Sequence, residues 1–345
     1  TLIDPREHHL KITRLHETVR RPLRDVRIPF SVLGERFGFR HIQQAMTFNE
    51  DALRLWQLDR AVPVGSETVG FDYLLIATGS AANKSQKDEN VFDLDDVSEQ
   101  DASDLLETLF SLPDVTPAPI TVVGGGATGI QFLFEIAHVL RTRRLGNPLN
   151  LVDSEDSVLK QFPGDFNSYV QARMAEKDIG YFPGRFFQGK EGDCVVLEDP
   201  QSGTRSEVAS GLTFLFLGKT PSDLLMADSF GHVLLGGRET LENMFTAGDC
   251  SYFKSLGSNV LTAQSAVRKG MTVARNILRQ HGDVILPLPY VYQDLGYLVS
   301  LGPSDAIGWL GLKRNIVAGF PAFVLKELVE AQYDLLLSGI DTYVV

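Results

Sequence analysis

The sequence predicts an α/β fold built on doubly wound parallel sheets, and three consecutive segments carry this prediction. Residues 120–123 form a β-branched run, residues 130–140 are almost wholly apolar, and residues 149–152 form a second apolar run. The middle segment is long enough for a helix, and a helix that is apolar on all sides must be buried. A buried helix between two buried strands is typical of a parallel sheet covered on its faces. We therefore expect a strand, a helix and a strand in this order.

Composition indicates a globular protein of more than one domain. The chain has 345 residues, of which 43% are hydrophobic and 22% charged, and at ~150 residues per domain this length predicts two domains and a smaller piece. The formal net charge is −12. An acidic chain is not expected to bind nucleic acid, because phosphates attract basic surfaces.

Cysteine, histidine and apolar patterns exclude further classes. Cys194 and Cys250 are too few for a disulfide scaffold and do not form a CxxC pair. His8 and His9 have no further ligand at metal-binding spacing, so no metal site is expected. No apolar run reaches the ~18–20 residues of a membrane-spanning helix, and we expect no signal peptide. These patterns favour the cytoplasm as the location.

A glycine-rich turn joins the first predicted strand to the helix. Gly124, Gly126 and Gly129 occupy the positions of a G-x-G-x-x-G motif. The first glycine permits the tight turn, the second lets the backbone approach a pyrophosphate, and the third lets the helix pack close to the strand. Asp153 ends the second strand, 24 residues beyond Gly129, near the ~20 at which an acid bonds the adenosine ribose. The motif predicts NADH rather than NADPH, and the alternative is a glycine-rich turn without a ligand.

Three further segments each combine a buried strand with a small turn. They are residues 71–77 with Thr78 and Gly79, residues 212–217 with Gly218, and residues 240–247 with Gly248 and Asp249. Singly, each is compatible with an ordinary buried strand. Together they resemble the ATG turn, the G-x-x-P turn and the terminal Gly-Asp of the FAD-dependent pyridine nucleotide-disulfide oxidoreductases. The resemblance implies FAD and NADH as cofactors, with Asp249 at the flavin ribityl chain.

The start of the chain resembles only part of that family's flavin-binding unit. Residues 1–4 resemble its second strand, with Asp4 as the acid for the adenosine ribose of FAD. By the same spacing, ~30 residues of strand, glycine loop and helix belong before Thr1. We expect that the chain is a piece of a longer protein; the alternative is that the flavin pyrophosphate cradle has been lost.

Within the family, the chain resembles the type II NADH dehydrogenases. Residues 124–130 (GGGATGI) are similar to their GGGATGV loop, and residues 263–270 (AQSAVRKG) resemble their AQ-x-A-x-Q stretch beside the isoalloxazine and the quinone pocket. This resemblance implies that Ala263 contacts the flavin and that Gln264 and Arg268 face the acceptor. The disulfide reductases and sulfide:quinone oxidoreductases need a cysteine pair near the flavin, which two isolated cysteines do not supply.

Two residues depart from that pattern. Gln131 stands where those enzymes carry a glutamate, and a glutamine cannot shuttle a proton. Arg268 replaces the second glutamine of the quinone stretch; an arginine there either bonds a quinone carbonyl or favours an anionic acceptor. The acceptor therefore stays open at this point.

The last 30 residues bear on membrane attachment. Apolar residues recur at helical spacing from Ile316 and Val317 to Leu335, with Pro321 in the first turn. Lys326, Glu327, Glu330 and Asp334 occupy the other side. The family places such helices on the membrane, but a membrane-surface helix normally has a basic polar face. We expect the helix to pack on the protein body or a second subunit, with membrane contact as the alternative.

A basic cluster stands near the start of this acidic chain. Its members are Lys11, Arg14, Arg20, Arg21, Arg24 and Arg27. We expect it to form a solvated surface, with a role at the flavin phosphates as the alternative.

These observations lead to one architecture and one function. We expect two three-layer Rossmann-like domains, one inserted in the other, with a C-terminal cap: an FAD domain of residues 1–82 and 211–288, an NADH domain of residues 88–210, and a cap of residues 289–345. The predicted function is an FAD-dependent NADH dehydrogenase that passes hydride from NADH via FAD to a quinone-type acceptor.

Two alternative functions remain, and so do questions about partners. One alternative is an NADH-dependent reductase of a soluble carrier or small molecule. The other is a flavin-free NADH-binding sensor module. The expected partner is a small-molecule acceptor, with a homodimer and peripheral contact with the cytoplasmic face of a membrane left open.

Overall fold

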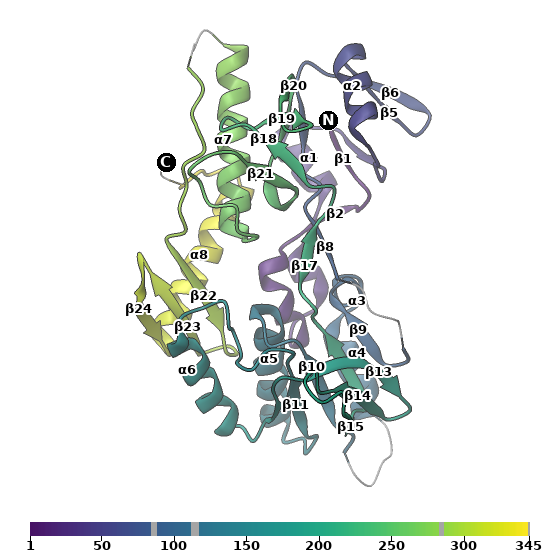
Figure 1. Ribbon diagram of the computed structural model, residues 1–345, viewed down its shortest axis with the longest axis vertical. Helices are drawn as coiled ribbons and strands as arrows, with labels where there is room; N and C mark the ends of the chain where they lie inside the picture. The colour runs from purple at the N-terminus through teal and green to yellow at the C-terminus, as the bar shows by residue number, and fades with distance from the viewer. Residues whose placement is uncertain (84–87, 112–116, 283–285, 344–345) are drawn as a thin grey trace. The chain divides into compact units, whose positions relative to one another are not determined.

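The computed structural model describes residues 1–83, 88–111, 117–282 and 286–343, and the chain divides into two compact units (Figure 1). Unit 1 consists of Thr1–Glu7, Gly38–Ala81 and Lys219–Asp294. Unit 2 consists of His8–Phe37, Ala82–Gly218 and Leu295–Val345. Each unit has its own sheet and its own apolar core.

The central sheet of unit 2 is wholly parallel. Its strand order is β12-β11-β10-β16-β9, and its strands are β9 (Val91–Asp93), β10 (Ile120–Val123), β11 (Leu149–Val152), β12 (Gly180–Phe182) and β16 (Leu212–Leu215). Every residue of β10 and β16 is buried, as expected for central strands covered on both faces. The predicted α/β fold and its first two strands are thus confirmed.

Helix α5 (Ala127–Arg143) confirms the predicted buried helix and has a reason to be apolar on all sides. It packs against β10 and β11, and also against the 3₁₀ helix η1 (Ile12–Val19) and β22 (Gly296–Ser300). Ile130 and Ile136 have no exposed surface. Two protein layers therefore cover the helix, one on the sheet side and one on the other.

Because of this second layer, the two compact units have other boundaries than the domains expected from the sequence. Leu15 and Val19 of η1 and Val299 of β22 belong to the same apolar core as α5. Residues 8–37 and 295–345 consequently lie in the compact unit of the glycine loop, whereas the sequence placed them in a flavin domain and a separate cap. The binding of FAD by one unit and NADH by the other stays a prediction.

Smaller elements complete unit 2. The helical ones are η2 (Leu23–Val26), α1 (Phe30–Phe37), α3 (Leu94–Glu99), α4 (Ala102–Phe110) and α6 (Gly164–Ala175). The strands pair as β2 (His8–Leu10) with β3 (Arg27–Pro29), and as two antiparallel sheets of β13 (Phe186–Glu191), β14 (Cys194–Glu198) and β15 (Arg205–Ala209), and of β22, β23 (Ala306–Leu310) and β24 (Leu312–Ala318).

Helix α8 (Phe320–Leu337) confirms the predicted C-terminal helix, with Pro321 in its first turn. The helix begins later than predicted: Ile316 and Val317 lie in β24 and pair with β23. Gly319, with φ of +78°, turns the chain from this strand into the helix. Across the described ranges, no helix has the length and apolar character to cross a membrane.

Unit 1 holds a mixed sheet in the order β21-β18-β19-β20-β7. Its strands are β7 (Leu74–Ile76), β18 (Leu225–Ala227), β19 (His232–Leu235), β20 (Glu239–Thr246) and β21 (Ser251–Phe253). β7 and β20 are parallel neighbours. Because parallel strands end at the same edge, the turns that follow these two strands lie together.

The remaining elements of unit 1 flank this sheet. They are β1 (Leu2–Asp4), β4 (His41–Gln43), α2 (Glu50–Asp59), β5 (Ala61–Val64), β6 (Glu67–Gly70), β8 (Ser80–Ala82), β17 (Lys219–Pro221), η3 (Gly248–Cys250) and α7 (Ala263–His281). β1 pairs in parallel with β4, and β5 forms a hairpin with β6. Thr262 caps α7, its side chain accepting the backbone N–H of Ser265.

Candidate functional site

The glycine loop between β10 and α5 needs its glycines for two different reasons. At Gly124, whose φ is +108°, an added Cβ would lie 2.2 Å from the carbonyl oxygen of Phe216. At Gly129 it would lie 1.9 Å from the carbonyl oxygen of Gly124. At Gly126 no described atom lies within 4 Å of that position. Packing therefore requires the outer two glycines, while the middle one leaves the backbone open to a ligand.

The same loop leads into the N-terminus of α5. Gly126 is the N-cap residue, and within the described part of the chain no side chain caps the helix there. The first backbone N–H groups of a helix lack intrahelical partners and carry the positive end of its dipole. The open face of Gly126 and the uncapped amides together fit a pyrophosphate.

Asp153 follows β11 at the same edge of the sheet. It is buried, and its carboxylate accepts hydrogen bonds from the backbone N–H groups of Gly125 and Glu155, the latter at 3.3 Å. Burial raises the pKa of the Asp153 carboxyl above its ordinary value, and the backbone hydrogen bonds oppose this effect. The carboxylate thus lies against the glycine loop, and its contact with a ribose stays a prediction.

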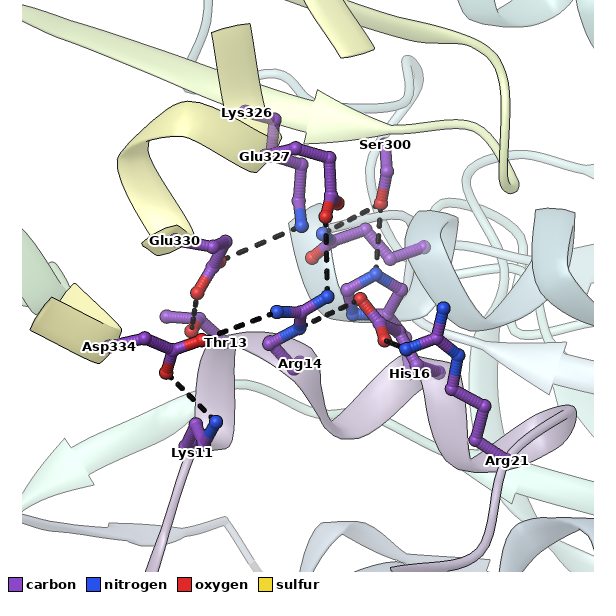
Figure 2. Close-up of polar contacts among 12 residues, drawn as sticks. Lys11, Thr13, Arg14, His16, Arg21, Ser300, Lys326, Glu327, Glu330 and Asp334 are labelled. Atoms are coloured by element: carbon purple, nitrogen blue, oxygen red, sulfur yellow. Dashed lines mark hydrogen bonds and ion pairs between the residues drawn. The ribbon is translucent and has the colours of Figure 1, made fainter. Parts of the chain in front are cut away.

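Gln131, two residues after Gly129, belongs to a buried hydrogen-bond network. Its Nε2 donates to Ser300 Oγ at 3.1 Å, and Ser300 Oγ lies 3.0 Å from His16 Nε2 (Figure 2). Burial lowers the pKa of His16 well below its ordinary value, and the charges of Lys326, Arg20 and Arg14 act in the same direction. The imidazole is therefore neutral near pH 7, and Gln131 is joined to the C-terminal sheet of unit 2.

Around this network, η1 and α8 are connected by ion pairs rather than exposed to solvent. Lys11 Nζ lies 2.8 Å from Asp334 Oδ1, and Arg14 Nη2 lies 3.2 Å from Glu327 Oε2 (Figure 2). Thr13 donates to Glu330 Oε2 at 2.9 Å. The prediction of a solvated basic cluster is therefore wrong for Lys11 and Arg14, because the acidic face of α8 covers them.

Two buried charges extend the cluster on either side. Arg20 Nε lies 2.8 Å from Glu135 Oε2 on α5, and Glu135 is 1% exposed. Lys326 is also buried, and its Nζ lies 3.6 Å from Glu330 Oε1. Arg24, in contrast, is exposed, as the sequence predicted.

In unit 1, the turns after β7 and β20 bring a second set of predicted residues together. Ser80 Oγ, just beyond Thr78 and Gly79, donates to Asp249 Oδ2 at 2.9 Å. Lys219 Nζ contacts the same carboxylate oxygen.

The glycines of these turns leave room beside that carboxylate. Gly79 and Gly248 have φ of +77° and +76°, and among the described residues no atom lies within 4 Å of a Cβ added at either. Open backbone beside an oriented carboxylate fits the ribityl chain of a flavin.

The other residues predicted to bind flavin are divided between the two units. Asp4 ends β1, and its Oδ1 accepts the backbone N–H of Arg6 at 2.8 Å. Gly218, with φ of +80°, belongs to unit 2. Ala263 is the first residue of α7 and is exposed.

Lys269 of α7 is a buried cation that the sequence did not single out. It is 1% exposed, its Nζ donates to the carbonyl oxygen of Ser251 at 2.7 Å, and it lies 5.4 Å from the ring centre of Phe253. Burial lowers the pKa of Lys269, while the Asp249 carboxylate opposes this effect. The side chain thereby ties α7 to the strand that follows the Gly248–Asp249 turn.

Gln264 and Arg268, one helical turn apart on α7, both contact Tyr292. Tyr292 Oη donates to Gln264 Oε1 at 2.8 Å, and the Arg268 guanidinium carbon lies 5.5 Å from the centre of the Tyr292 ring. Gln131, in contrast, lies in unit 2. No sequence motif marks Tyr292, which lies in an irregular segment after α7.

The parallel sheet, the open glycine loop and the Asp249 turn together define a dinucleotide-binding α/β protein. Comparison with known proteins gives the family. Residues 31–270 match the family model of the pyridine nucleotide-disulphide oxidoreductases, and the chain belongs to this family of flavin-dependent oxidoreductases. The predicted family and fold are confirmed.

Two curated relatives share limited identity with the chain. Dihydrolipoyl dehydrogenase of Haloferax volcanii is 24% identical over 226 residues, which are 62% of this chain and 43% of that protein. The mitochondrial external alternative NAD(P)H-ubiquinone oxidoreductase B1 of Arabidopsis thaliana is 22% identical over 263 residues, which are 65% of this chain and 46% of that protein. The chain thus spans less than half the length of either relative.

Solved structures match over nearly the whole chain. The sulfide:quinone oxidoreductase of Aquifex aeolicus has a TM-score of 0.77 at 18% identity, covering 99% of this chain and 85% of that one. NDH2 of Plasmodium falciparum in complex with NADH has a TM-score of 0.78 at 14% identity, covering 98% and 90%. At these identities the likeness establishes the fold.

Proposed function

We propose that the chain acts as an FAD-dependent NADH dehydrogenase that passes hydride from NADH via FAD to a quinone-type acceptor. The observation that carries the proposal is the open backbone at Gly126, next to the uncapped N-terminus of α5. Family membership supports the cofactors, and the names of the Arabidopsis and Aquifex proteins support a quinone. Cys194 and Cys250 form no CxxC pair, which does not favour dithiol chemistry.

Each group of residues has a task in this function. When bound, FAD would take two electrons with the hydride of NADH and pass them on to the acceptor. The Gly126 backbone and the α5 amides hold the NADH pyrophosphate, and Asp153 binds its ribose. Asp249, oriented by Ser80 and Lys219, holds the ribityl chain. None of these residues needs to act as a nucleophile or a base.

Gln131 takes no part in proton transfer in this scheme. An amide cannot release a proton near neutral pH, and its Nε2 is engaged by Ser300. Gln131 instead anchors the first turns of α5 to β22. Gln264 and Arg268 on α7 are the residues that face the acceptor.

A visible absorption spectrum of the purified full-length protein tests this function. We expect flavin bands that bleach when NADH is added without oxygen and return when a short-chain ubiquinone analogue is added. A colourless protein that still binds NADH would contradict the proposal and leave an NADH-binding sensor module. Recovery of the bands with a soluble protein carrier, but not with the quinone, would identify a carrier reductase.

The outer face of α8 supports peripheral contact with a membrane, from which a quinone would be taken. The acidic face of the helix pairs with η1, whereas Phe320 and Leu328 on the outside are 63% and 61% exposed. An apolar cavity of about 430 Å³ between α8 and the sheet of β22 and β23 is lined by Leu298, Leu310, Leu325, Leu328, Val329, Ala331, Gln332, Leu335 and Thr342. Exposed large apolar side chains gathered on one helix are typical of an interaction site.

Sedimentation with phosphatidylcholine–phosphatidylglycerol vesicles tests the membrane contact. The wild-type protein is expected to sediment with the vesicles, and a variant with Phe320→Ser and Leu328→Ser to stay in solution. Both substituted side chains are exposed, so the double variant should keep the wild-type fold. A wild-type protein that stays in solution would contradict the membrane contact, and a concentration-dependent dimer would then explain the apolar face.

A further inference from the structure

Lys269 of α7 is a buried cation that the proposed function does not use. Its side chain is 1% exposed, and its Nζ lies 5.4 Å from the ring centre of Phe253. Moving an ammonium group out of water is unfavourable unless hydrogen bonds and nearby negative charge replace its hydration. The groups around Lys269 Nζ therefore show which part of the fold its charge stabilises.

These groups are the two ends of the turn that carries Asp249. Lys269 Nζ donates to the carbonyl oxygen of Ser251 at 2.7 Å and to that of Gly248 at 3.5 Å. Asp249 lies between these two residues, in η3. The Gly248 carbonyl oxygen also accepts the backbone N–H of Ser251 and, at 2.7 Å, its hydroxyl group. One ammonium group thus bonds both ends of the turn of residues 248–251 and fastens it to α7.

The carboxylate in this turn is the group that needs a fixed position. The Asp249 side chain is 12% exposed, its Oδ2 accepts the hydroxyl of Ser80 at 2.9 Å, and Lys219 Nζ contacts the same oxygen. The Asp249 carboxylate raises the pKa of Lys269 against the effect of burial, so the two charges stabilise each other. Because hydrogen bonds weaken steeply with distance and angle, a carboxylate on a loose turn would bind hydroxyl groups poorly.

We propose that Lys269 is a positioning residue for the flavin, because it holds the turn of residues 248–251 so that the Asp249 carboxylate meets the hydroxyl groups of the ribityl chain. The proposal rests on the proposed function, in which Asp249 binds that chain, and adds to it a residue that acts through Asp249. Without the ammonium group, the carbonyl oxygens of Gly248 and Ser251 lose a donor that joins them. The turn must then be ordered when FAD binds, and this ordering lowers the affinity.

The test is the Lys269→Met variant, since methionine has a similar length and shape but neither charge nor donor. Titration of the flavin-free, full-length protein with FAD measures the Kd through the quenching of flavin fluorescence. The Kd for FAD should rise about tenfold, the effect of one lost charge-assisted hydrogen bond. The Kd for NADH, measured by isothermal titration calorimetry, should be unchanged, because the proposed function places NADH at the glycine loop of unit 2. A wild-type Kd for FAD would overturn the proposal.

A double-mutant cycle with Asp249→Asn separates positioning from general stabilisation. Asparagine keeps the size of the side chain and removes its charge, so this variant should itself weaken the binding of FAD. If Lys269 acts through Asp249, adding Lys269→Met to Asp249→Asn should raise the Kd further by no more than about twofold. Full effects that multiply in the double variant would show that Lys269 acts elsewhere, and the proposal would be wrong.

Asn276→Leu is the matched control. Asn276 is 2% exposed and lies seven residues after Lys269 on α7, which is about two helical turns. Its Nδ2 donates to the carbonyl oxygens of Phe230 and Leu288, each at 2.9 Å, and both residues lie outside the turn of residues 248–251. The Kd for FAD should match that of the wild type. If loosening of α7 explained the effect of Lys269→Met, Asn276→Leu would raise the Kd equally and overturn the proposal.

Two further outcomes are distinguished by the same titrations. If Lys269→Met does not fold, Lys269→Gln replaces it, because glutamine keeps an N–H donor but reaches less far. A raised Kd for FAD with an unchanged Kd for NADH in that variant supports the proposal, and a wild-type Kd for FAD overturns it. A wild-type protein that binds no FAD would instead contradict the proposed function.

Discussion

The polar cluster around His16 in unit 2 and the polar face of α7 in unit 1 differ in how deeply their side chains are buried. Around His16, carboxylates and cations from η1, α5 and α8 are paired with one another, and Glu135 and Lys326 are buried. On α7, Gln264 and Arg268 are half-buried and both contact Tyr292, one through a hydrogen bond and the other across its ring. Paired and buried polar groups stabilise one packing arrangement, whereas half-buried polar groups at the surface can exchange their contacts for solvent or a ligand.

The strongest way to break this comparison is to remove one charge from the buried cluster. Arg20→Met leaves the Glu135 carboxylate buried without its partner, and loss of one member of a buried pair costs about 3 kcal/mol. We expect the free energy of unfolding in urea to fall by this amount. Arg24→Met is the matched control, since Arg24 is 87% exposed and should change stability by less than about 0.5 kcal/mol. Equal effects in the two variants would contradict the structural role of the cluster.

The glycine loop offers the corresponding test for a ligand site. Gly126→Ala adds a methyl group where no described atom lies within 4 Å, so the fold should tolerate it. The methyl group would occupy the space of the pyrophosphate, and we expect the Kd for NADH to rise about tenfold or more, which corresponds to ~1.4 kcal/mol. Isothermal titration calorimetry measures this Kd.

Gly164→Ala is the control for this variant. Gly164 is the first residue of α6, and an added Cβ there also meets no described atom within 4 Å. NADH affinity should be unchanged. A Gly126→Ala protein that binds NADH like the wild type would exclude the loop as the pyrophosphate site.

The pH dependence of stability distinguishes a buried neutral His16 from a solvated one. Its pKa is lowered well below 6.5 in the folded state, so between these values the unfolded chain binds a proton that the folded chain does not. Stability therefore rises with pH in this window. We expect His16 to account for a loss of about 1 kcal/mol on going from pH 6.5 to 5.5.

The same measurement on His16→Gln isolates this contribution. Glu135 acts with the opposite sign, because burial raises the pKa of its carboxyl and the folded state then binds the extra proton. The wild type and His16→Gln share Glu135, so the difference between their unfolding free energies at the two pH values removes it. Parallel curves would show that His16 is not held neutral.

Local pattern explains what could be predicted from the sequence. The strand, glycine loop and helix at 120–143 depend on spacing within about twenty residues, and their features appear where expected. Gln131 and Ser300 are 169 positions apart, and no periodicity relates them. Tyr292 likewise reaches Gln264 from an irregular segment, so only the folded chain brings them together.

The C-terminal helix shows the same limit in another form. Helical spacing correctly groups Glu327, Glu330 and Asp334 on one face, but it does not state what that face meets. This face packs against η1 and its N-cap residue, which lie more than 300 residues earlier. They supply its partners Lys11, Thr13 and Arg14. Complementary charge turned the acidic face inward and left apolar side chains such as Leu328 outside.

The smallest expected effect lies at the edge of the cluster and sharpens the comparison. Glu327→Gln weakens the contact with Arg14, but Glu327 is 36% exposed, so the free energy of unfolding should fall by only about 0.5 kcal/mol. Raising the salt concentration to about 0.5 M should remove this difference, because salt screens exposed charges more than buried ones. The effect of Arg20→Met should persist at the same salt concentration. A cluster in which both effects vanished together would be a solvated surface, as the sequence first indicated.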